Sequence, residues 1–244
     1  MNWNQVTALV TGGTRGIGAQ LVQQLHAKGT RVIATGSTPA SVATAQTVML
    51  YASWQVLDLA SSASISTLVE KLKSLKINLV IHNAGIQQMR DWTDFNNPVL
   101  FGTEQEMAIN FTGPVELTRQ LLPQLSQMQS RIVFVSSGLA LAPKSSSPVY
   151  CASKAALRSF AKSLRGQLQL SGSSIHISEA LPPLVDTDMT RGRGKGKISA
   201  ANAAQQILHG IDKGKHEIDV GATSLLRLIM RISPALGERI MIGK

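Results

Sequence analysis

The sequence of 244 residues is poor in cysteine, in aromatic side chains and in long apolar runs. Its one cysteine, Cys151, excludes an intrachain disulfide, and the N-terminus lacks a secretory signal pattern. Both observations favour a reducing, cytoplasmic setting. No apolar run reaches the roughly 18 residues of a membrane-spanning helix, so no transmembrane segment is expected. Aromatic residues make up 4% of the chain and offer no clear stacking platform for a steroid or a nucleobase.

Acidic residues are also scarce: 24 Lys and Arg face 14 Asp and Glu, a net charge of +10. The cations are scattered, except in Arg191–Lys197, where one occupies every second position. That segment reads either as a solvated loop or as an anion site. No zinc-ligand cluster or nucleic-acid module accompanies the charge, so neither a metal nor a nucleic-acid partner is expected. With 43% hydrophobic residues, the chain can bury a large core, which excludes disorder.

Short apolar runs alternate with longer amphipathic segments, the pattern of an α/β fold with a parallel sheet. The expected strands are Val6–Val10, Arg31–Ala34, Trp54–Asp58, Leu79–His82, Arg131–Val135, Ser174–Ala180 and Glu217–Val220. The expected helices are Ile17–Lys28, Ile65–Leu75, Val115–Met128, Val149–Leu170 and Ala200–Lys213. No repeat or linker divides the chain, so we expect one domain over residues 1–222 and an apolar extension over 223–244. Within it, Leu225–Ile242 has an apolar stripe suited to core or subunit packing, or to a membrane surface.

The first strand runs into Thr11-Gly-Gly-Thr-Arg-Gly-Ile-Gly18, and a helix follows at once. Glycines allow a sharp turn and close approach to a diphosphate, and the helix N-terminus offers free N–H groups to it. The spacing differs from the general dinucleotide pattern G-x-G-x-x-G, so a tight turn that binds nothing stays open at this point.

The end of the second strand, Val32-Ile-Ala-Thr-Gly-Ser37, carries no acid. Enzymes that choose NAD usually place an acid there, where it binds the ribose hydroxyls and would repel a 2′-phosphate. Its absence favours NADP(H), with Arg15 as the countercharge unless that side chain is simply solvated.

Tyr150 and Lys154 are four residues apart in an expected helix and therefore share a face. A free tyrosine has a pKa of about 10, and a nearby ammonium should lower it, so that the phenol can act as an acid or base. Ser137 follows the fifth expected strand, at the sheet edge where ligands bind, and could stabilise charge on a substrate oxygen. Asn110 lies in an apolar helix, where its amide needs partners; alone it would read as structural.

Taken together in this order, these residues resemble the short-chain dehydrogenase/reductase family over nearly the whole chain. Gly12, Gly16 and Gly18 match its T-G-x-x-x-G-x-G loop, and Asn83-Ala-Gly85 follows the fourth strand as in the family. The resemblance implies a Rossmann-type, doubly wound sheet of seven parallel strands in a three-layer α/β/α domain. It implies a catalytic set of Asn110, Ser137, Tyr150 and Lys154. The implied NADP(H) site comprises Gly12, Thr14, Arg15, Gly16, Ile17, Gly18, Ser37, Asp58, Leu59, Asn83, Ala84, Gly85, Tyr150, Lys154, Val185 and Thr187.

Within that set, the family implies distinct roles. Tyr150 is the acid/base, Ser137 orients the substrate oxygen, Lys154 also holds the nicotinamide ribose, and Asn110 supports a water-mediated proton relay. The Asp58–Leu59 pair contacts the adenine, while the Val185 backbone and Thr187 meet the nicotinamide carboxamide or phosphates.

Three departures from the family stand out. His82 replaces the usual first Asn of Asn-Asn-Ala-Gly and reads as a satisfied strand-end residue rather than a catalyst. Ser37 stands where the family often has a second Arg. The usual Pro-Gly is Pro182-Pro183, followed by Val-Asp-Thr187 after one residue. Residues 138–190 resemble the DltE-like oxidoreductase branch in this respect.

The family implies a carbonyl or alcohol substrate, and the basic segment suggests that this substrate is anionic or acyl-linked. The helices Val115–Met128 and Val149–Leu170 commonly form subunit interfaces in the family, which implies a homodimer or homotetramer. Two other classes stay open: an NADP(H)-binding redox sensor without turnover, and a protein that binds membrane surfaces or nucleic acid through its charge.

Overall fold

The computed structural model describes residues 1–96 and 102–243. Its main sheet has seven strands in the order β3-β2-β1-β4-β5-β6-β9, and every pairing in it is parallel. The strands are β1 (Thr7–Val10), β2 (Arg31–Gly36), β3 (Ser53–Val56), β4 (Leu79–His82), β5 (Arg131–Val135), β6 (His176–Leu181) and β9 (Glu217–Asp219). The chain therefore winds outward from β1 in both directions, which confirms the doubly wound fold expected from the sequence.

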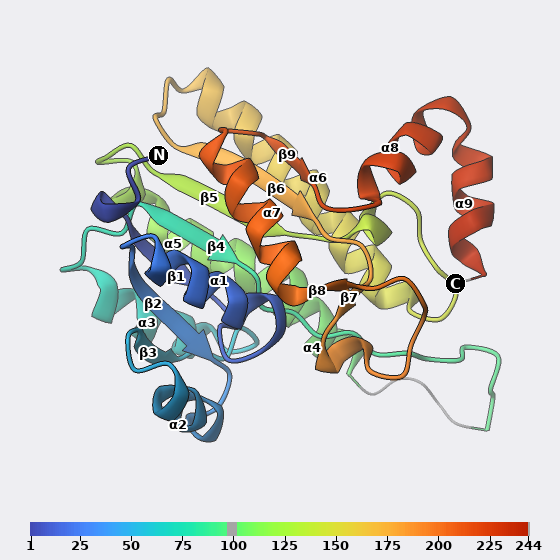
Figure 1. Ribbon diagram of the computed structural model, residues 1–244, viewed down its shortest axis with the longest axis horizontal. Coiled ribbons are helices and arrows are strands. Elements are labelled where there is room, and N and C mark those ends of the chain that lie inside the picture. Colours follow the sequence, from blue (N-terminus) through green and yellow to red (C-terminus); the bar gives the residue numbers. More distant parts are fainter. Residues whose placement is uncertain (97–101, 244) are drawn as a thin grey trace.

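Helices cover both faces of this sheet (Figure 1). On one face lie α1 (Gly16–Ala27), α2 (Pro39–Val48) and α7 (Ala200–Asp212), and on the other α3 (Ser62–Leu72), α5 (Gly113–Leu125) and α6 (Pro148–Leu170). Alternate strand residues face opposite layers: Ala8 and Val10 pack toward α1 and α7, whereas Leu9 packs toward α3 and α5. The strands are short and apolar because they are buried on both faces.

The register of the sheet fixes where ligands can approach. Leu9 of β1 pairs with Ile33 of β2 and with Val80 of β4, so the carboxyl ends of these strands lie along one edge. The segments that follow β1, β2, β4, β5 and β6 therefore meet there. In open α/β sheets, ligands bind at this edge, where the order of the strands reverses.

Several elements differ from the sequence prediction. Helix α2 was not predicted, and neither was the short α4 (Thr103–Met107), which continues through a π-helical turn at Ala108–Thr112 into α5. The basic segment connects a 3-10 turn at Asp188–Thr190 to β8 (Ile198–Ser199), which pairs with β7 (Val185–Asp186).

The apolar tail forms two helices, α8 (Thr223–Ile232) and α9 (Pro234–Ile242). They stand together at one end of the molecule (Figure 1). The carbonyl of Ile242 accepts hydrogen bonds from the N–H and the hydroxyl of Ser145, which fixes the end of α9. Within the two described stretches, no helix has the length and apolarity needed to cross a bilayer.

Candidate active site

The glycine loop folds tightly between β1 and α1. Gly12 and Gly16 have φ angles of +65° and +57°, which side chains rarely adopt. A Cβ at Gly18 would lie 2.0 Å from the Gly12 carbonyl oxygen. No side chain caps α1, whose N-cap residue is Arg15, so the first N–H groups of this helix have no partner from a capping side chain. The loop thus provides the close backbone approach and the free donors that a diphosphate requires.

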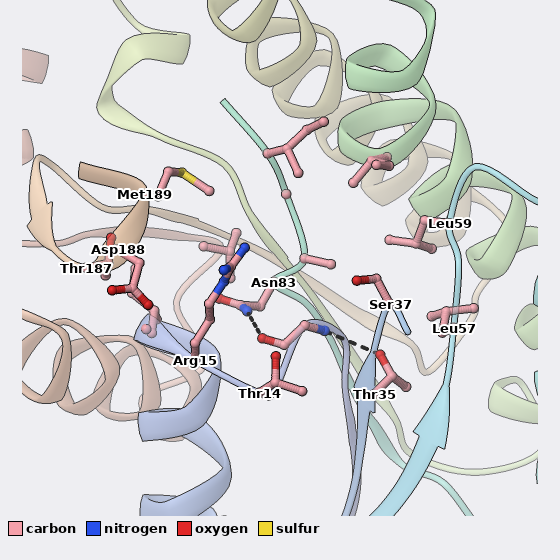
Figure 2. A pocket seen from close by; sticks show the side chains of 18 of the residues that line it. Thr14, Arg15, Thr35, Ser37, Leu57, Leu59, Asn83, Thr187, Asp188 and Met189 are labelled. Carbon is pink, nitrogen blue, oxygen red and sulfur yellow. Dashed lines mark hydrogen bonds between the residues drawn. The ribbon is translucent and has the colours of Figure 1, made fainter. Parts of the chain in front are cut away.

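Hydrogen bonds from the segment after β4 clamp this loop. The Asn83 Nδ2 atom donates to the carbonyls of Thr11 and Gly12, each at 3.1 Å. In return, the Thr11 hydroxyl oxygen accepts the N–H groups of Asn83 and Ala84, also at 3.1 Å. On the other side, Gly12 N–H donates to the hydroxyl of Thr35 at the end of β2. Three strand ends are thereby fixed around one groove (Figure 2).

The groove extends from the glycine loop to Tyr150 and Lys154. Every residue of the expected NADP(H) set lines it except Gly18 and Val185. Gly18 instead lies against the Gly12 carbonyl, and Val185 is buried in β7 with its own carbonyl accepting from the Thr190 hydroxyl. The lining also includes residues that the sequence did not assign to the cofactor site: Thr35, Leu57, Ile86, Ile109, Val135, Ser136, Pro182, Asp188 and Met189.

The end of β2 carries no carboxylate in the structure either. Ser37 faces the groove, and Thr38 caps α2 by accepting the N–H of Ser41. The Arg15 side chain rises into the groove between the segment Thr187–Met189 and the walls that carry Ser37 and Leu59 (Figure 2). This half of the groove is therefore polar. It presents a cation and hydroxyls, and no carboxylate stands at the end of β2 to repel a phosphate.

Lys154 lies at the bottom of the groove. It is 3% exposed, and its Nζ atom donates to the Val135 carbonyl at 3.0 Å and lies 5.7 Å from the centre of the Tyr150 ring. Burial lowers the pKa of Lys154 to about 8, against the charge of Glu179, which raises it. Lys154 is therefore still mostly an ammonium at neutral pH, but one close to releasing its proton.

The pKa of Tyr150 moves in the direction opposite to the sequence prediction. Burial raises it to about 12, although a hydrogen bond with Ser137 and the charge of Arg193 both lower it. The charge of Lys154, which was expected to lower the pKa of Tyr150, is not among the causes of the shift. Its ammonium donates to the Val135 carbonyl. Tyr150 is thus a neutral phenol at neutral pH, the form that donates a proton.

Asn110 is completely buried in the π-helical turn and connects three parts of the site. Its Oδ1 atom accepts the Ile86 N–H at 2.9 Å, and its Nδ2 atom donates to the Ile86 carbonyl and to the Ser153 hydroxyl. A Cβ at Gly85 would lie 3.1 Å from Asn110 Oδ1 and 3.3 Å from Lys154 Nζ. Both side chains therefore reach the segment after β4 because that position is a glycine.

The sequence model of the family described as short chain dehydrogenase matches residues 6–197 of this chain. The chain belongs to the short-chain dehydrogenase/reductase family. It is 36% identical over 227 residues to the uncharacterized oxidoreductase DltE of Bacillus subtilis, covering 89% of each chain. It is 28% identical over 204 residues to the 3-oxoacyl-(acyl-carrier-protein) reductase FabG of Escherichia coli, covering 78% of each.

Solved structures of the family share the fold. A short chain dehydrogenase from Burkholderia cenocepacia, crystallised in complex with NADP, superposes with a TM-score of 0.88 at 24% identity over all of both chains. At that identity the likeness concerns the fold. The recognition of the family, and of its DltE-like branch, is thus confirmed.

The basic segment contributes one cation to the surroundings of Tyr150. Arg193 is half-buried and donates to Gln87 Oε1 at 3.0 Å. Its charge acts on Tyr150 and on Lys144, a second half-buried cation whose pKa is lowered by burial and by that same charge. In residues 1–96 and 102–243, neither cation forms an ion pair. Lys195, by contrast, is exposed.

His82 lies outside the lining of the groove. Its Nε2 atom is 2.9 Å from the hydroxyl oxygen of Thr118, and its ring stacks on Phe134. The other ring nitrogen, Nδ1, is buried without a partner in the described residues. Burial lowers the pKa of His82 to about 3, so the ring is neutral at physiological pH. Of the two ring nitrogens of His82, which were expected to have hydrogen-bond partners, only Nε2 thus has one among the described residues.

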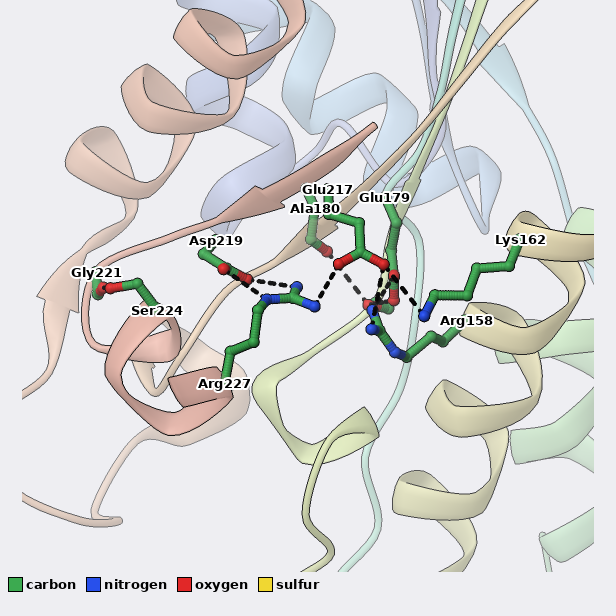
Figure 3. A network of polar contacts seen from close by, with 10 residues as sticks. Arg158, Lys162, Glu179, Ala180, Glu217, Asp219, Gly221, Ser224 and Arg227 are labelled. Atoms are coloured by element: carbon green, nitrogen blue, oxygen red, sulfur yellow. Dashed lines mark hydrogen bonds and ion pairs between the residues drawn. The ribbon is translucent and has the colours of Figure 1, made fainter. Parts of the chain in front are cut away.

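A buried carboxylate behind the site was not predicted from the sequence. Glu179 of β6 is 1% exposed and is bonded to Ser136 and Arg158 (Figure 3). The available signal was its position: an acid inside a strand that is buried on both faces is costly unless it is paired. No group of three or more metal-ligating side chains occurs among the residues that the structure describes.

Proposed function

We propose that this protein is an NADP(H)-dependent oxidoreductase that interconverts a carbonyl and the corresponding alcohol, with Tyr150 as the acid/base. The observation that carries the proposal is the position of Tyr150. The half-buried side chain of Tyr150, with the Ser137 hydroxyl beside it, and the Lys154 ammonium both line the end of a groove whose other end is a glycine loop.

The residues present fit a dinucleotide. The loop at Gly12, Gly16 and Gly18 would hold the diphosphate, because a Cβ at any of these positions would meet neighbouring atoms at 2.0–3.1 Å. Asp58 and Leu59 would contact the adenine end, and Asn83, Ala84 and Gly85 would form the floor. We assign NADP(H) rather than NAD(H) because Ser37 and Arg15 stand where an acid would exclude a 2′-phosphate. When bound, the cofactor supplies or accepts the hydride at the substrate carbon.

The proton in reduction comes from the protein. The Tyr150 hydroxyl donates it to the carbonyl oxygen, and the Ser137 hydroxyl holds that oxygen and stabilises its developing charge. Lys154 binds the nicotinamide ribose and favours the phenolate left behind. Asn110 holds the Ile86 backbone at both its N–H and its carbonyl, and from this position it supports the return of a proton through water.

We propose that the substrate is anionic, or that it is an acyl group bound to an acidic carrier. Arg193 and Lys144 lie near Tyr150 and repel one another. Two half-buried cations that form no ion pair with any described residue favour an anionic ligand. The similarity to a 3-oxoacyl-(acyl-carrier-protein) reductase supports including acyl thioesters among the candidates.

The first experiment follows NADPH oxidation against aldehydes, ketones, quinones and 3-ketoacyl thioesters. Wild-type protein is run beside Tyr150→Phe, with NADH as the cofactor control. Turnover that is lost by at least about a hundredfold in the variant would support the proposal. If Tyr150→Phe keeps wild-type turnover, Tyr150 is not the acid/base. If NADPH binds tightly and no compound is reduced, the redox-sensor alternative gains support.

The charge of the substrate is tested by Arg193→Glu, with Lys195→Glu as the matched control. Both variants change the net charge equally, but only Arg193 is half-buried near Tyr150. We expect KM for an anionic substrate to rise about tenfold or more in Arg193→Glu, which corresponds to about 1.4 kcal/mol. Lys195→Glu should change it little. Equal effects on charged and neutral substrates would contradict the assignment.

We also propose that the outer faces of α5 and α6 form a subunit interface in a homodimer or homotetramer. Light scattering coupled to size exclusion should then give two or four times the chain mass of 26.1 kDa. A single-chain mass at micromolar concentration would contradict this.

A further inference from the structure

Glu179 is an acidic side chain in the interior of the sheet. Its strand position pairs with Phe134 of β5, and the side chain is 1% exposed. The Ser136 hydroxyl donates to Glu179 Oε1 at 2.5 Å, and the Arg158 guanidinium donates to Oε2. Burying a carboxylate in an apolar layer is unfavourable, and these two partners offset that cost.

Arg158 connects this carboxylate to a chain of ion pairs at the edge of the sheet (Figure 3). Arg158 also reaches Glu217 of β9 at 3.2 Å, and Lys162 approaches the same Glu217 oxygen at 3.2 Å. Arg227 of α8 contacts Glu217 and forms two bonds to Asp219, at 2.6 and 2.7 Å. Three cations thus face three carboxylates, and the C-terminal helices are fixed to the sheet through them.

The inner end of this chain lies beside Lys154. The Val135 carbonyl accepts from Lys154 Nζ at 3.0 Å, and the next residue, Ser136, donates to Glu179. At the end of β5, Val135 therefore binds the Lys154 ammonium, and the next residue, Ser136, binds the Glu179 carboxylate. Burial lowers the pKa of Lys154, and the charge of Glu179 opposes this effect and favours the ammonium. Arg158, one turn further along α6, and Glu217 on β9 face Glu179, while Tyr150 faces Lys154 from its own helix.

We infer that Glu179 is a positioning residue for the reaction: its carboxylate, bonded to the Ser136 hydroxyl, fixes the end of β5 whose Val135 carbonyl orients Lys154, and it supplies the countercharge behind that ammonium. The inference rests on the proposed function, in which the Lys154 ammonium binds the ribose and supports Tyr150. A buried lysine without such a countercharge would lose its proton near neutral pH. The family-wide Tyr-Lys pair here depends on a charge supplied by a neighbouring strand.

The test is Glu179→Gln, with Asp219→Asn as the matched control. Both variants remove one carboxylate from the same network. Of the three cations in that network, however, Asp219 contacts Arg227 and not Arg158, and it does not contact Ser136. The first readout is the titration of the Lys154 side chain by NMR in cofactor-free protein with labelled lysines, assigned with Lys154→Arg. We expect the titration midpoint of Lys154 to fall by about one pH unit in Glu179→Gln and to remain unchanged in Asp219→Asn.

The second readout is the affinity for NADPH, measured by fluorescence. Glu179→Gln should weaken binding at pH 8 in the wild-type background and leave it unchanged in Lys154→Arg, because arginine keeps its charge. In turnover assays, kcat/KM of Glu179→Gln should begin to decline at a pH about one unit lower than in the wild type. An unmoved Lys154 midpoint, or the same movement in Asp219→Asn, would overturn the inference. Turnover that survives Tyr150→Phe would overturn the proposed function instead, and the cofactor-free titration would still stand.

If Glu179→Gln does not fold, as judged by circular dichroism, Ser136→Ala replaces it. Loss of the hydroxyl lets the carboxylate relax toward Arg158, away from the end of β5. A smaller fall in the Lys154 midpoint is then expected, and an unchanged midpoint would overturn the inference.

Discussion

A single methyl group at Gly18 should both destabilise the protein and weaken its binding of NADPH. The Cβ of Gly18→Ala would lie 2.0 Å from the Gly12 carbonyl oxygen and 2.5 Å from Asn83 Nδ2. Since such contacts do not fall below 3.0 Å, the loop and helix α1 must separate by at least about 1 Å. Overpacking of this kind costs about 1–3 kcal/mol, and a lost Asn83 hydrogen bond adds about 1 kcal/mol.

The matched control is Gly166→Ala, in the C-terminal part of α6. A Cβ there meets nothing within 4 Å, and the φ angle is not positive. Alanine is favoured over glycine inside a helix by about 0.5–1 kcal/mol, so this variant should be more stable than wild type. For a domain of this size, 1 kcal/mol moves the melting temperature by roughly 2–4 °C.

The assay is thermal unfolding together with NADPH titration of the three proteins. Gly18→Ala should melt roughly 4–16 °C below wild type, and its Kd for NADPH should rise about tenfold or more because the moved donors no longer fit a diphosphate. Gly166→Ala should melt higher and bind equally well. A Gly18→Ala protein with wild-type stability and affinity would refute the view that α1 is held against the Gly12 carbonyl.

Two further predictions concern stability. His82 stays neutral when folded, with a pKa of about 3 against about 6.5 unfolded, so the unfolded chain binds more protons between these values and stability falls as the pH falls through them. Between pH 7 and pH 5, the free energy of unfolding should fall by about 2 kcal/mol less in His82→Asn than in wild type, as measured by denaturant unfolding. Equal decreases in the two proteins would contradict the burial argument. Thr38→Ala removes the cap that accepts the Ser41 N–H and should cost about 1 kcal/mol by the same measurement, whereas no change would mean that α2 does not depend on its cap.

The sequence predicted the strands well because each is a short apolar run buried on both faces. It missed α2, in which only Val42 and Ala45 are buried, because two apolar contacts among Ser, Thr and Ala produce no helical period. The split of the tail was available from Ser233 and Pro234, a cap followed by proline at the first helical position, and was read instead as one stripe.

The candidate site was predictable to the extent that loop ends meet at one sheet edge. Its protonation states were not, because they depend on burial that spacing does not reveal. The four-residue interval between Tyr150 and Lys154 predicts proximity, and the structure places the ammonium 5.7 Å from the ring, yet Lys154 donates to the Val135 carbonyl. Glu179, which sets the charge of Lys154, comes from a strand that was considered only for its apolar pattern.

These protonation states have a consequence for the direction of the reaction. A phenol with a pKa of about 12 is protonated at neutral pH, so Tyr150 already holds the proton that a carbonyl oxygen needs. Oxidation of an alcohol requires the phenolate, which is scarce until the pH approaches that value. Reduction rates should therefore change little as the pH rises from 6 toward neutrality, whereas oxidation rates should climb with pH. Parallel pH profiles in the two directions would show that bound ligands lower the pKa of Tyr150 enough to remove this preference.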